Sequence, residues 1–413
     1  MKFLIVNLTY RPHYGGVENS IHYIGRYLLD SNHEVKILTS NRGLERNAPL
    51  RRVEVIDNIT TFRYKRVNLR SSVSRLLAEL FDILGAYHAT ARIQRYFSPD
   101  VIIVRDMKTG LGAVLAAPSA YSYYIMPSLI QNESRVNATN NGGNTSTVRI
   151  VYKSIKQALT VLQQQVVQNI LIRIVSKNVV FSENMAVQAQ LAKIVGVNNY
   201  AIIPPGVDSD LFVPNPLEKK RFRLKYSIGK QDMLVVVVGR IVAAKGIDIL
   251  LRALPLCNNP NIKILIVGDG PEVESLSELS SNLNIADRVI FQPGTKRPEK
   301  YYQVADIFAL PSRYETFGQT ILEALSSGLP ILAFDSRDRN VHTATAEIML
   351  NDINGILVDY SEEGLAHGLN TIASFSKNKM ESITNTNRQL AKTRYPWSRI
   401  TEYLAKNASG WRA

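Results

Sequence analysis

Short apolar runs alternate with longer amphipathic segments along the first half of the chain. The apolar runs predict strands over residues 3–8, 34–40, 101–104, 121–126 and 178–182. Helical periodicity occupies the intervals, at about 17–31, 71–97, 109–117, 150–174 and 184–195. Short apolar strands separated by helices are typical of βαβ units, in which helices cover both faces of a parallel sheet.

The same alternation returns in the second half. Strands are predicted over residues 234–240, 263–270, 289–294, 307–312, 330–335 and 354–360. Helices are predicted at about 246–254, 271–283, 298–305 and 318–327, and helical patterns fill most of the chain after residue 360. Residues 204–216 contain four prolines and are typical of a connector. The pattern therefore predicts two doubly wound α/β domains.

The expected organisation follows from these boundaries. Residues 1–203 form an N-terminal domain, residues 204–216 the connector and residues 217–394 a C-terminal domain. Residues 133–148 are polar, rich in Asn and Gly, and predict a mobile insertion. Open α/β sheets bind ligands at the carboxyl ends of their strands, so we expect the active site in a cleft between the two domains.

Charge is concentrated in the first half of the chain. Residues 1–200 hold 24 of the 49 Lys and Arg residues but 12 of the 35 Asp and Glu residues, so they carry +12 of the net charge of +14. The excess lies in Arg42–Arg75 and continues to Arg95. It indicates either a solubilising surface or a face for an anionic partner, such as a membrane surface or a saccharide. Nucleic acid is not expected, because no binding module is recognisable.

Residues 71–97 combine a helical apolar stripe with flanking basic residues. Two interpretations stay open: a helix that packs on the core, or a helix that lies at a lipid headgroup interface.

The composition excludes secreted, disulfide-built and membrane-spanning proteins. The single cysteine, Cys257, cannot form an intramolecular disulfide, so we expect a cytoplasmic environment. The apolar run at the N-terminus is too short for a signal-peptide core. The longest uncharged stretch, Thr109–Asn132, contains Pro118 and Pro127, which favours a helix, a turn and a strand over a membrane span.

Residues 311–330, PSRYETFGQTILEALSSGLP, carry most of the chemical information. Phe317 and Gly318 lie at the expected start of a helix, where backbone N–H groups and the helix dipole suit a phosphate or diphosphate. Glu323, in the second turn, is placed to accept hydrogen bonds from a ribose diol. Glu315, in the preceding loop, is placed to meet hydroxyls of a sugar on the same nucleotide.

Two further motifs suit an anion. Gly15-Gly16 follows the first strand, at a turn where backbone can approach a phosphate. Arg240 and Lys245 lie at a strand end and a helix start, where Arg binds phosphate bidentately and Lys acts as a point charge. No P-loop, nucleophile elbow or His-Glu-x-x-His motif is present, and the third glycine of a dinucleotide fingerprint is missing.

Together these motifs resemble the signature of the retaining GT-B glycosyltransferases of family 4, the glycosyl transferases group 1. Residues 311–324 fit the pattern P-S-x-x-E-x-F-G-x-x-x-x-E-A, and a G-x-P follows. Residues 205–208 and 267–271 resemble further family elements, and residues 15–18 are similar to its N-terminal glycine loop. The resemblance covers essentially the whole chain, densely in the second half and sparsely in the first.

The resemblance implies two Rossmann-like domains, with a terminal helix, residues 395–413, that returns to the N-terminal domain. It implies transfer of a sugar, with retention at the anomeric carbon, from a UDP- or GDP-sugar to a saccharide or lipid-linked saccharide. The expected product is a bacterial cell-surface polysaccharide, such as O-antigen, capsule or lipopolysaccharide. No cofactor or metal ion is expected. The basic first domain suggests a peripheral contact with the inner face of the cytoplasmic membrane.

The resemblance also assigns roles to residues. Arg240 and Lys245 would neutralise the donor diphosphate, and with Glu315 they are the expected catalytic residues. The donor site is expected to contain Gly15, Gly16, Arg240, Lys245, Glu315, Phe317, Gly318 and Glu323.

One feature departs from the family's pattern. Family members often carry a histidine at the end of an N-terminal-domain strand, whereas the corresponding residues here, 121–133, have Met126-Pro127. No histidine is therefore assigned to catalysis, since the other candidates occupy positions typical of structural residues: His13, His22 and His88. Asp106 and Glu133 are the candidates for contact with the acceptor.

Three alternatives remain. A nucleotide-sugar epimerase of similar fold would bind a nucleotide but no acceptor, and would not require Glu315–Gly318. A phosphorylase would use inorganic phosphate as a co-substrate. A basic nucleic-acid-binding protein belongs to a third class, with salt-dependent binding.

Overall fold

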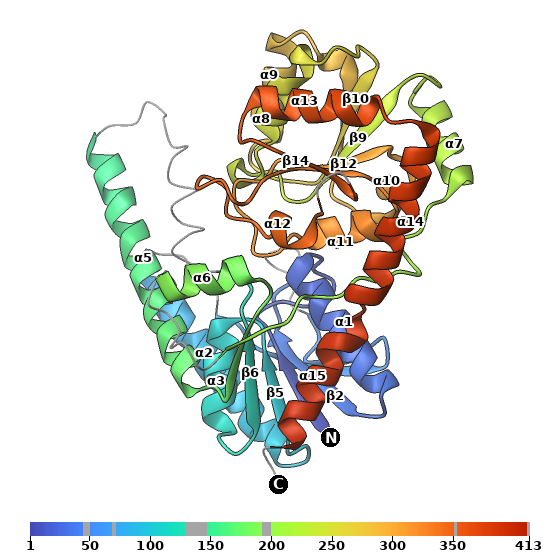
Figure 1. The fold of residues 1–413 in the computed structure, drawn as a ribbon. Helices are drawn as coiled ribbons and strands as arrows, with labels where there is room; N and C mark the ends of the chain where they lie inside the picture. Colours follow the sequence, from blue (N-terminus) through green and yellow to red (C-terminus); the bar gives the residue numbers. More distant parts are fainter. Residues whose placement is uncertain (44–49, 68–71, 129–146, 192–199, 351–352, 411–413) are drawn as a thin grey trace. The chain divides into compact units, whose positions relative to one another are not determined.

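The computed structural model describes residues 1–413 except 44–49, 68–71, 129–146, 192–199, 351–352 and 411–413. Contacts divide the chain into two compact units. The N-terminal unit comprises residues 1–181, 186–204 and 397–413, and the C-terminal unit comprises residues 182–185 and 205–396. Each unit contains one predominantly parallel sheet with helices around it, which confirms the predicted fold class (Figure 1). Most of the predicted insertion at 133–148 lies outside the described residues.

The sheet of the N-terminal unit has eight strands in the order β3-β4-β2-β1-β5-β6-β7-β8. All neighbours pair in parallel except β3 and β4. The strands are β1 (Lys2–Val6), β2 (Glu34–Ser40), β3 (Val53–Ile56), β4 (Ile59–Tyr64), β5 (Val101–Val104), β6 (Tyr121–Ile125), β7 (Lys177–Val180) and β8 (Tyr200–Ile202).

The hairpin β3–β4 lies inside the segment that the sequence marked only as basic. Asp57 and Asn58 form its turn with φ angles of 49° and 64°, values typical of a type I′ turn. Arg63 on β4 is buried, forms an ion pair with Glu54 and donates a hydrogen bond of 2.7 Å to the carbonyl of Arg11. Part of the excess charge in Arg42–Arg75 therefore stabilises this edge of the sheet instead of facing a partner.

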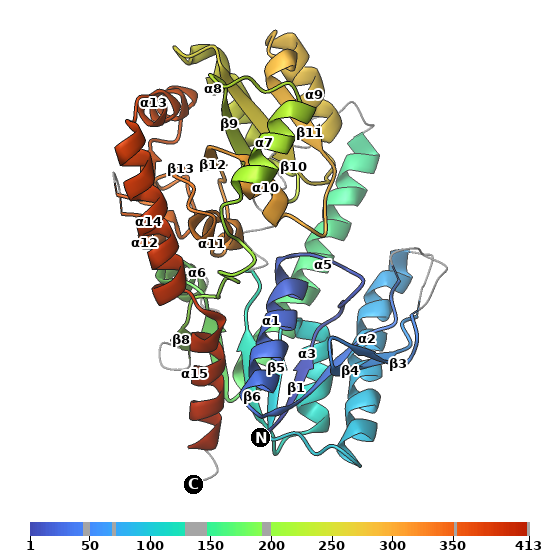
Figure 2. The same cartoon turned by 90° about the vertical axis from the view of Figure 1, so that its right-hand side faces the viewer.

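Helices cover both faces of this sheet (Figures 1 and 2). Neighbouring helices α2, α3 and α5 pack in a row, whereas α1 packs against α15. Trp397, at the start of α15, stacks on Tyr23 of α1 with ring centroids 5.3 Å apart, so the terminal helix belongs to the N-terminal unit, as the resemblance implied. The helices are α1 (Gly16–Asp30), α2 (Ser72–Gln94), α3 (Met107–Ala116), α5 (Thr147–Ile174), α15 (Trp397–Ser409) and α6 (Glu183–Leu191), of which residues 183–185 belong to the C-terminal unit.

The uncharged stretch Thr109–Asn132 forms most of α3, a turn and strand β6, as predicted, up to the last described residue, Ser128. None of the helices in the described parts of the chain combines the length and apolar composition needed to cross a membrane.

The sheet of the C-terminal unit has six parallel strands in the order β11-β10-β9-β12-β13-β14. They are β9 (Met233–Val238), β10 (Ile262–Val267), β11 (Val289–Gln292), β12 (Ile307–Leu310), β13 (Ile331–Phe334) and β14 (Gly355–Val358). The α-helices are α7 (Pro216–Lys225), α8 (Ile247–Ala253), α9 (Val273–Asn282), α10 (Glu299–Val304), α11 (Gln319–Ser326), α12 (Thr345–Ile348), α13 (Glu362–Ala373) and α14 (Lys377–Arg394). The 3₁₀ turns are η1 (Ala243–Lys245), η2 (Leu254–Leu256) and η3 (Ala286–Arg288).

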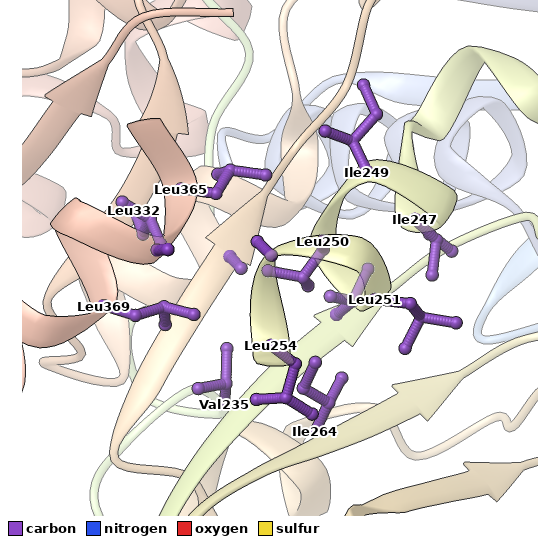
Figure 3. Packing of buried hydrophobic residues seen from close by; sticks show 14 of the residues in the cluster. Val235, Ile247, Ile249, Leu250, Leu251, Leu254, Ile264, Leu332, Leu365 and Leu369 are labelled. Atoms are coloured by element: carbon purple, nitrogen blue, oxygen red, sulfur yellow. The ribbon is translucent and has the colours of Figure 1, made fainter. Parts of the chain in front are cut away.

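The core of the C-terminal unit is a layer of aliphatic side chains between its helices and its sheet (Figure 3). Leu250 and Leu251 of α8 meet Leu365 and Leu369 of α13 above Val235 of β9. This packing fixes the start of α8, next to which the candidate site lies.

Replacement of a core leucine tests this packing. Leu250→Ala removes a fully buried side chain, so the free energy of unfolding should fall by about 3 kcal/mol. Urea unfolding followed by far-UV circular dichroism measures the change. The matched control is Leu256→Ala, at a half-exposed position of η2, which should change stability by less than about 1 kcal/mol. Equal losses in both variants would contradict the assigned core.

Candidate active site

The first part of the site in the C-terminal unit is the turn after β9. Arg240 is exposed at the end of the strand, and Lys245 ends the 3₁₀ turn η1. Gly246, immediately before α8, has φ = 61°, and a Cβ atom there would lie 2.0 Å from the carbonyl oxygen of Pro311. Glycine is therefore required for the close approach of this turn to the loop that carries Glu315.

Arg313 attaches that loop to the same turn. Its guanidinium donates hydrogen bonds of 2.8 Å to Asp248 Oδ2 and to the Tyr360 hydroxyl, and its backbone N–H donates to the carbonyl of Ala244 over 2.8 Å. Because these bonds connect the loop to both sides of Lys245, Arg313 positions one motif against the other. Arg313 was not among the predicted site residues, although its place inside residues 311–330 was a signal.

The structure brings two of the predicted catalytic residues into contact. Lys245 Nζ and Glu315 Oε1 form an ion pair, and both side chains are largely buried. The backbone N–H of Glu315 donates to the carbonyl of His342 over 2.9 Å, which fixes the loop from its other side. The pair joins a cation suited to phosphate and a carboxylate suited to sugar hydroxyls.

A small pocket lies at the same strand ends. It is lined in part by Gly239, Arg240, Lys245 and Ser312. The hydroxyl of Ser312 is buried and has no hydrogen-bond partner among the described residues. A buried hydroxyl without a partner is costly, so a ligand oxygen in this pocket would satisfy it. The resemblance of residues 311–324 to the family's pattern had marked this position, but not its hydroxyl.

Helix α11 begins beside this loop. Gly318 precedes the helix with φ = 90°, in the left-handed region that favours glycine, and Phe317 is buried against Tyr395. The first N–H groups of any α-helix lack partners within the helix. Thr320, in the first turn, has a buried hydroxyl without a partner among the described residues. The start of α11 at Gly318 agrees with the sequence, and binding of an anion there stays a prediction.

Glu323 lies in the second turn of α11, as predicted, but its side chain is enclosed by protein instead of being open to solvent. The side chain is buried, and Oε2 accepts a hydrogen bond of 2.7 Å from the Tyr302 hydroxyl on α10. Burial raises the pKa of the Glu323 carboxyl to about 7, and the hydrogen bond from Tyr302 opposes that shift. One carboxylate oxygen is thus already paired with Tyr302, and binding of ribose by Glu323 stays a prediction.

The N-terminal unit contains its own pocket, with an empty volume of about 590 Å³. It lies where β1, β5 and β6 end and where α1 and α3 begin, which is the usual ligand position in such sheets. Neither glycine of the predicted loop adopts a left-handed backbone, and Gly15 is extended at φ = −176°. A Cβ atom on Gly15 would lie 2.7 Å from Glu18 Oε2, whereas one on Gly16 would meet nothing within 4 Å, and binding of a donor phosphate by this loop stays a prediction.

Two charged residues at the end of β5 line this pocket. Arg105 is 2% exposed, donates a hydrogen bond of 2.8 Å to the carbonyl of Ile125 and lies over the Phe181 ring. Its Nε atom has no partner among the described residues. Burial lowers the pKa of the Arg105 guanidinium to about 10. An arginine this deeply buried without an ion pair to any described residue is unusual, and no sequence motif marked this position.

Asp106, a predicted acceptor residue, follows directly. Its Oδ2 atom accepts a hydrogen bond of 3.1 Å from the backbone N–H of Lys108 and so caps α3, while Oδ1 is buried without a partner among the described residues. Burial raises the pKa of the Asp106 carboxyl. Glu133, the other predicted acceptor residue, lies outside the described residues.

The histidines occupy structural positions. His13 bonds to the carbonyl of Arg42, His22 contacts the Tyr10 hydroxyl, and His88 packs on the ring of Tyr87. None of the three lines the pocket of the N-terminal unit. Within the described ranges, no three His, Cys, Asp or Glu side chains form a group that could hold a metal ion.

Two units, each built on a predominantly parallel sheet with helices around it, define a doubly wound α/β protein, and family models specify it further. The model for glycosyltransferase family 4 matches residues 14–211, and the model for glycosyl transferases group 1 matches residues 218–390. Together they account for nearly the whole chain. The chain belongs to glycosyltransferase family 4.

Individual relatives agree with this family. The chain is 36% identical over 168 residues to a GDP-mannose-dependent alpha-(1-6)-phosphatidylinositol monomannoside mannosyltransferase of Mycolicibacterium smegmatis. That match covers 38% of the chain and spans 42% of the relative. Two solved structures share the fold over 99% of the chain. Sucrose-phosphate synthase from Thermosynechococcus elongatus has a TM-score of 0.78 at 17% identity, with 98% of it covered. Anabaena Alr3699/HepE in complex with UDP and glucose has a TM-score of 0.73 at 20% identity, with 99% covered.

The burial of Glu323 predicts a pH-dependent stability. A carboxyl with a pKa of about 7 in the folded chain and an ordinary value when unfolded stabilises the fold fully below about pH 4.5. That contribution, about 3 kcal/mol, is lost as the pH rises through 7. Relative to Glu323→Gln, the wild type should therefore lose about 3 kcal/mol between about pH 4.5 and 8, measured by urea unfolding.

An exposed carboxyl on α9 supplies the control: Glu278→Gln should leave the pH dependence unchanged. A constant difference between wild type and Glu323→Gln across this range would disprove the buried, protonated carboxyl.

Proposed function

We propose that this chain is a retaining glycosyltransferase that moves a sugar from a UDP- or GDP-sugar to a saccharide or lipid-linked saccharide. The observation that carries the proposal is the contact between Lys245 and Glu315, beside Arg240 and the N-terminus of α11. A cation, a carboxylate and helix N–H groups at one place match a diphosphate that is attached to a sugar.

Donor binding would exchange the partner of Lys245. Without a donor, Glu315 neutralises the ammonium group. A diphosphate carries more charge than one carboxylate, so it would attract Lys245 and Arg240 and release Glu315 to accept hydrogen bonds from hydroxyls of the donor sugar. The hydroxyls of Ser312 and Thr320 have no hydrogen-bond partner in the described part of the chain, so they are suited to bind further donor oxygens.

The chemical step needs stabilisation of the leaving diphosphate. Lys245 and Arg240 would supply positive charge where negative charge develops as the glycosidic bond to the diphosphate breaks. No metal ion is required for this role in the proposal, since the two cations perform it. The leaving phosphate would assist removal of the acceptor proton on the same face of the sugar, which gives retention.

The acceptor would bind in the pocket of the N-terminal unit. Arg105 Nε and Asp106 Oδ1 both lack partners among the described residues and line this pocket, one as a donor and the other as an acceptor or, when protonated, a donor. Gln168, also in the lining, donates to the Tyr124 hydroxyl over 3.2 Å. Such a set suits a hydroxylated acceptor that carries an anionic group near Arg105. Glu133 stays a prediction for the same acceptor.

The nature of the relatives supports a lipid-linked acceptor and a nucleotide-sugar donor. The mannosyltransferase named above takes its name from GDP-mannose and a phosphatidylinositol mannoside, and the Anabaena protein was solved with UDP and glucose. We extend the proposal to assembly of a bacterial cell-surface saccharide at the inner face of the cytoplasmic membrane. Thermal-shift screening against UDP- and GDP-sugars, followed by mass spectrometry of products, tests donor and acceptor together. An epimerised nucleotide sugar without any transfer product would favour the epimerase alternative.

Removal of the side chain that is proposed to bind the diphosphate should abolish most of the transferase activity. Lys245→Ala deletes a charge that acts on the leaving group, so kcat/KM for transfer should fall by about 10²–10³-fold while the circular dichroism spectrum is retained. The matched control is Lys377→Ala, at an exposed position on α14, which should have wild-type kinetics. Full activity in Lys245→Ala would contradict the assignment of this site.

Replacement of Arg105 should weaken binding of the acceptor but not binding of the donor. Arg105→Gln removes the buried cation, so the KM for an anionic acceptor should rise about tenfold or more, with nucleotide affinity unchanged. Arg105→Lys keeps the charge and should recover part of the loss. Arg92→Gln, at an exposed position on α2, is the control. Equal weakening of nucleotide and acceptor by Arg105→Gln would show that Arg105 does not act on the acceptor.

A further inference from the structure

A short segment, residues 182–185, belongs to the C-terminal unit, although the chain before and after it belongs to the N-terminal unit. The segment contains Ser182, which is 1% exposed, and the first turn of α6. No motif in the sequence marked either of them. The hydrogen bonds that hold this segment in the C-terminal unit lead to the loop that carries Glu315.

The hydroxyl of Ser182 makes two hydrogen bonds. Its Oγ atom accepts the backbone N–H of Met185 over 3.0 Å, so Ser182 caps α6. The same hydroxyl donates to the carbonyl of Thr316 over 3.2 Å, a bond that we call the tether. A serine hydroxyl has one hydrogen and two lone pairs, so the cap uses a lone pair and the tether uses the hydrogen. The cap stabilises the helix, whereas the tether holds the loop at Thr316.

Glu347 of α12 holds the same turn of α6. Its carboxylate accepts the backbone N–H of Glu183 over 2.8 Å and that of Asn184 over 2.7 Å. Together with Ser182, it satisfies the first three N–H groups of α6, which have no partner inside the helix. A carboxylate is also favoured at the positive end of the helix dipole. The start of α6 is therefore bonded both to α12 and to Thr316.

These contacts anchor the loop around Glu315 on two sides. The backbone N–H of Glu315 donates to the carbonyl of His342, which lies shortly before α12 in the chain. The carbonyl of Thr316 accepts the tether from Ser182. The peptide group before Glu315 and the peptide group after Thr316 are thus both fixed. The direction in which the Glu315 side chain leaves the backbone depends on both anchors.

We propose that Ser182 is a positioning residue for Glu315 and acts through its bond to Thr316. Glu347 keeps Ser182 in place. This role rests on the proposed function, in which Glu315 accepts hydrogen bonds from hydroxyls of the donor sugar. A displacement of about 1 Å at such a group can cost about 10²-fold in rate. The cations proposed for the diphosphate lie on a different turn, so Ser182 should affect turnover and not nucleotide affinity.

The variant Ser182→Asp separates the tether from the cap. An aspartate accepts the N–H of Met185 and caps a helix as well as serine does, but its carboxylate has no hydrogen to donate to Thr316. The kcat for transfer should fall about tenfold, while calorimetry with UDP or GDP should show no weakening of affinity. Ser182→Thr keeps both bonds and should recover most of the kcat.

Amide hydrogen exchange reports the same tether without a donor. In Ser182→Asp, the peptide that spans residues 313–318 should exchange about fivefold faster than in the wild type, as expected for the loss of one hydrogen bond. Glu347→Gln keeps one acceptor oxygen and should accelerate this exchange by a smaller factor. Circular dichroism verifies that both variants fold.

The matched control is Ser376→Ala, which removes the cap of α14, where Ser376 accepts the N–H of Lys379 over 3.3 Å. It should leave both the kcat and the exchange of residues 313–318 unchanged. A wild-type kcat in Ser182→Asp would overturn the proposal, whether or not exchange is faster. Equal effects of Ser376→Ala and Ser182→Asp would overturn it as well.

Failure of the proposed function gives a different result. A wild type that transfers no sugar from any UDP- or GDP-sugar would refute the proposed function. Unchanged exchange of residues 313–318 in Ser182→Asp would refute the tether alone.

Discussion

The ion pair between Lys245 and Glu315 is the interaction on which the candidate site depends. Opposite charges hold the loop before α11 against the turn before α8, and Arg313 secures the same junction through Asp248 and Tyr360. Each partner is suited to a different part of a nucleotide sugar. The pair thus keeps the site assembled without a ligand and can open when a stronger anion arrives, since a diphosphate offers Lys245 more charge than a carboxylate.

The N-terminal unit presents a different physical problem. Arg105 and Asp106 are buried at the end of a central strand, and both keep a polar atom without a partner among the described residues. Such atoms lower stability, and active sites are where proteins retain them.

The sequence predicted the repetitive parts of this fold because apolar periodicity records burial directly. Every predicted strand and helix of the C-terminal unit is present, and the start of α11 at Gly318 was visible in its motif. The hairpin β3–β4 was missed because its alternating charged residues resemble a solvated segment, and α7 because it lies next to a connector rich in proline. Arg105 was missed because burial of a charge cannot be seen in spacing. Glu323 was located correctly, yet its contact with Tyr302 comes from a distant part of the chain.

The exchange of partners at Lys245 is the central claim, and calorimetric titration of the nucleoside diphosphate into two variants tests it most directly. If Glu315 and the diphosphate compete for Lys245, then Glu315→Gln should bind the diphosphate as tightly as the wild type or more tightly, whereas Lys245→Gln should bind it more weakly. Weakening of similar size in both variants would show that Glu315 supports the diphosphate instead of competing with it, and would contradict this account.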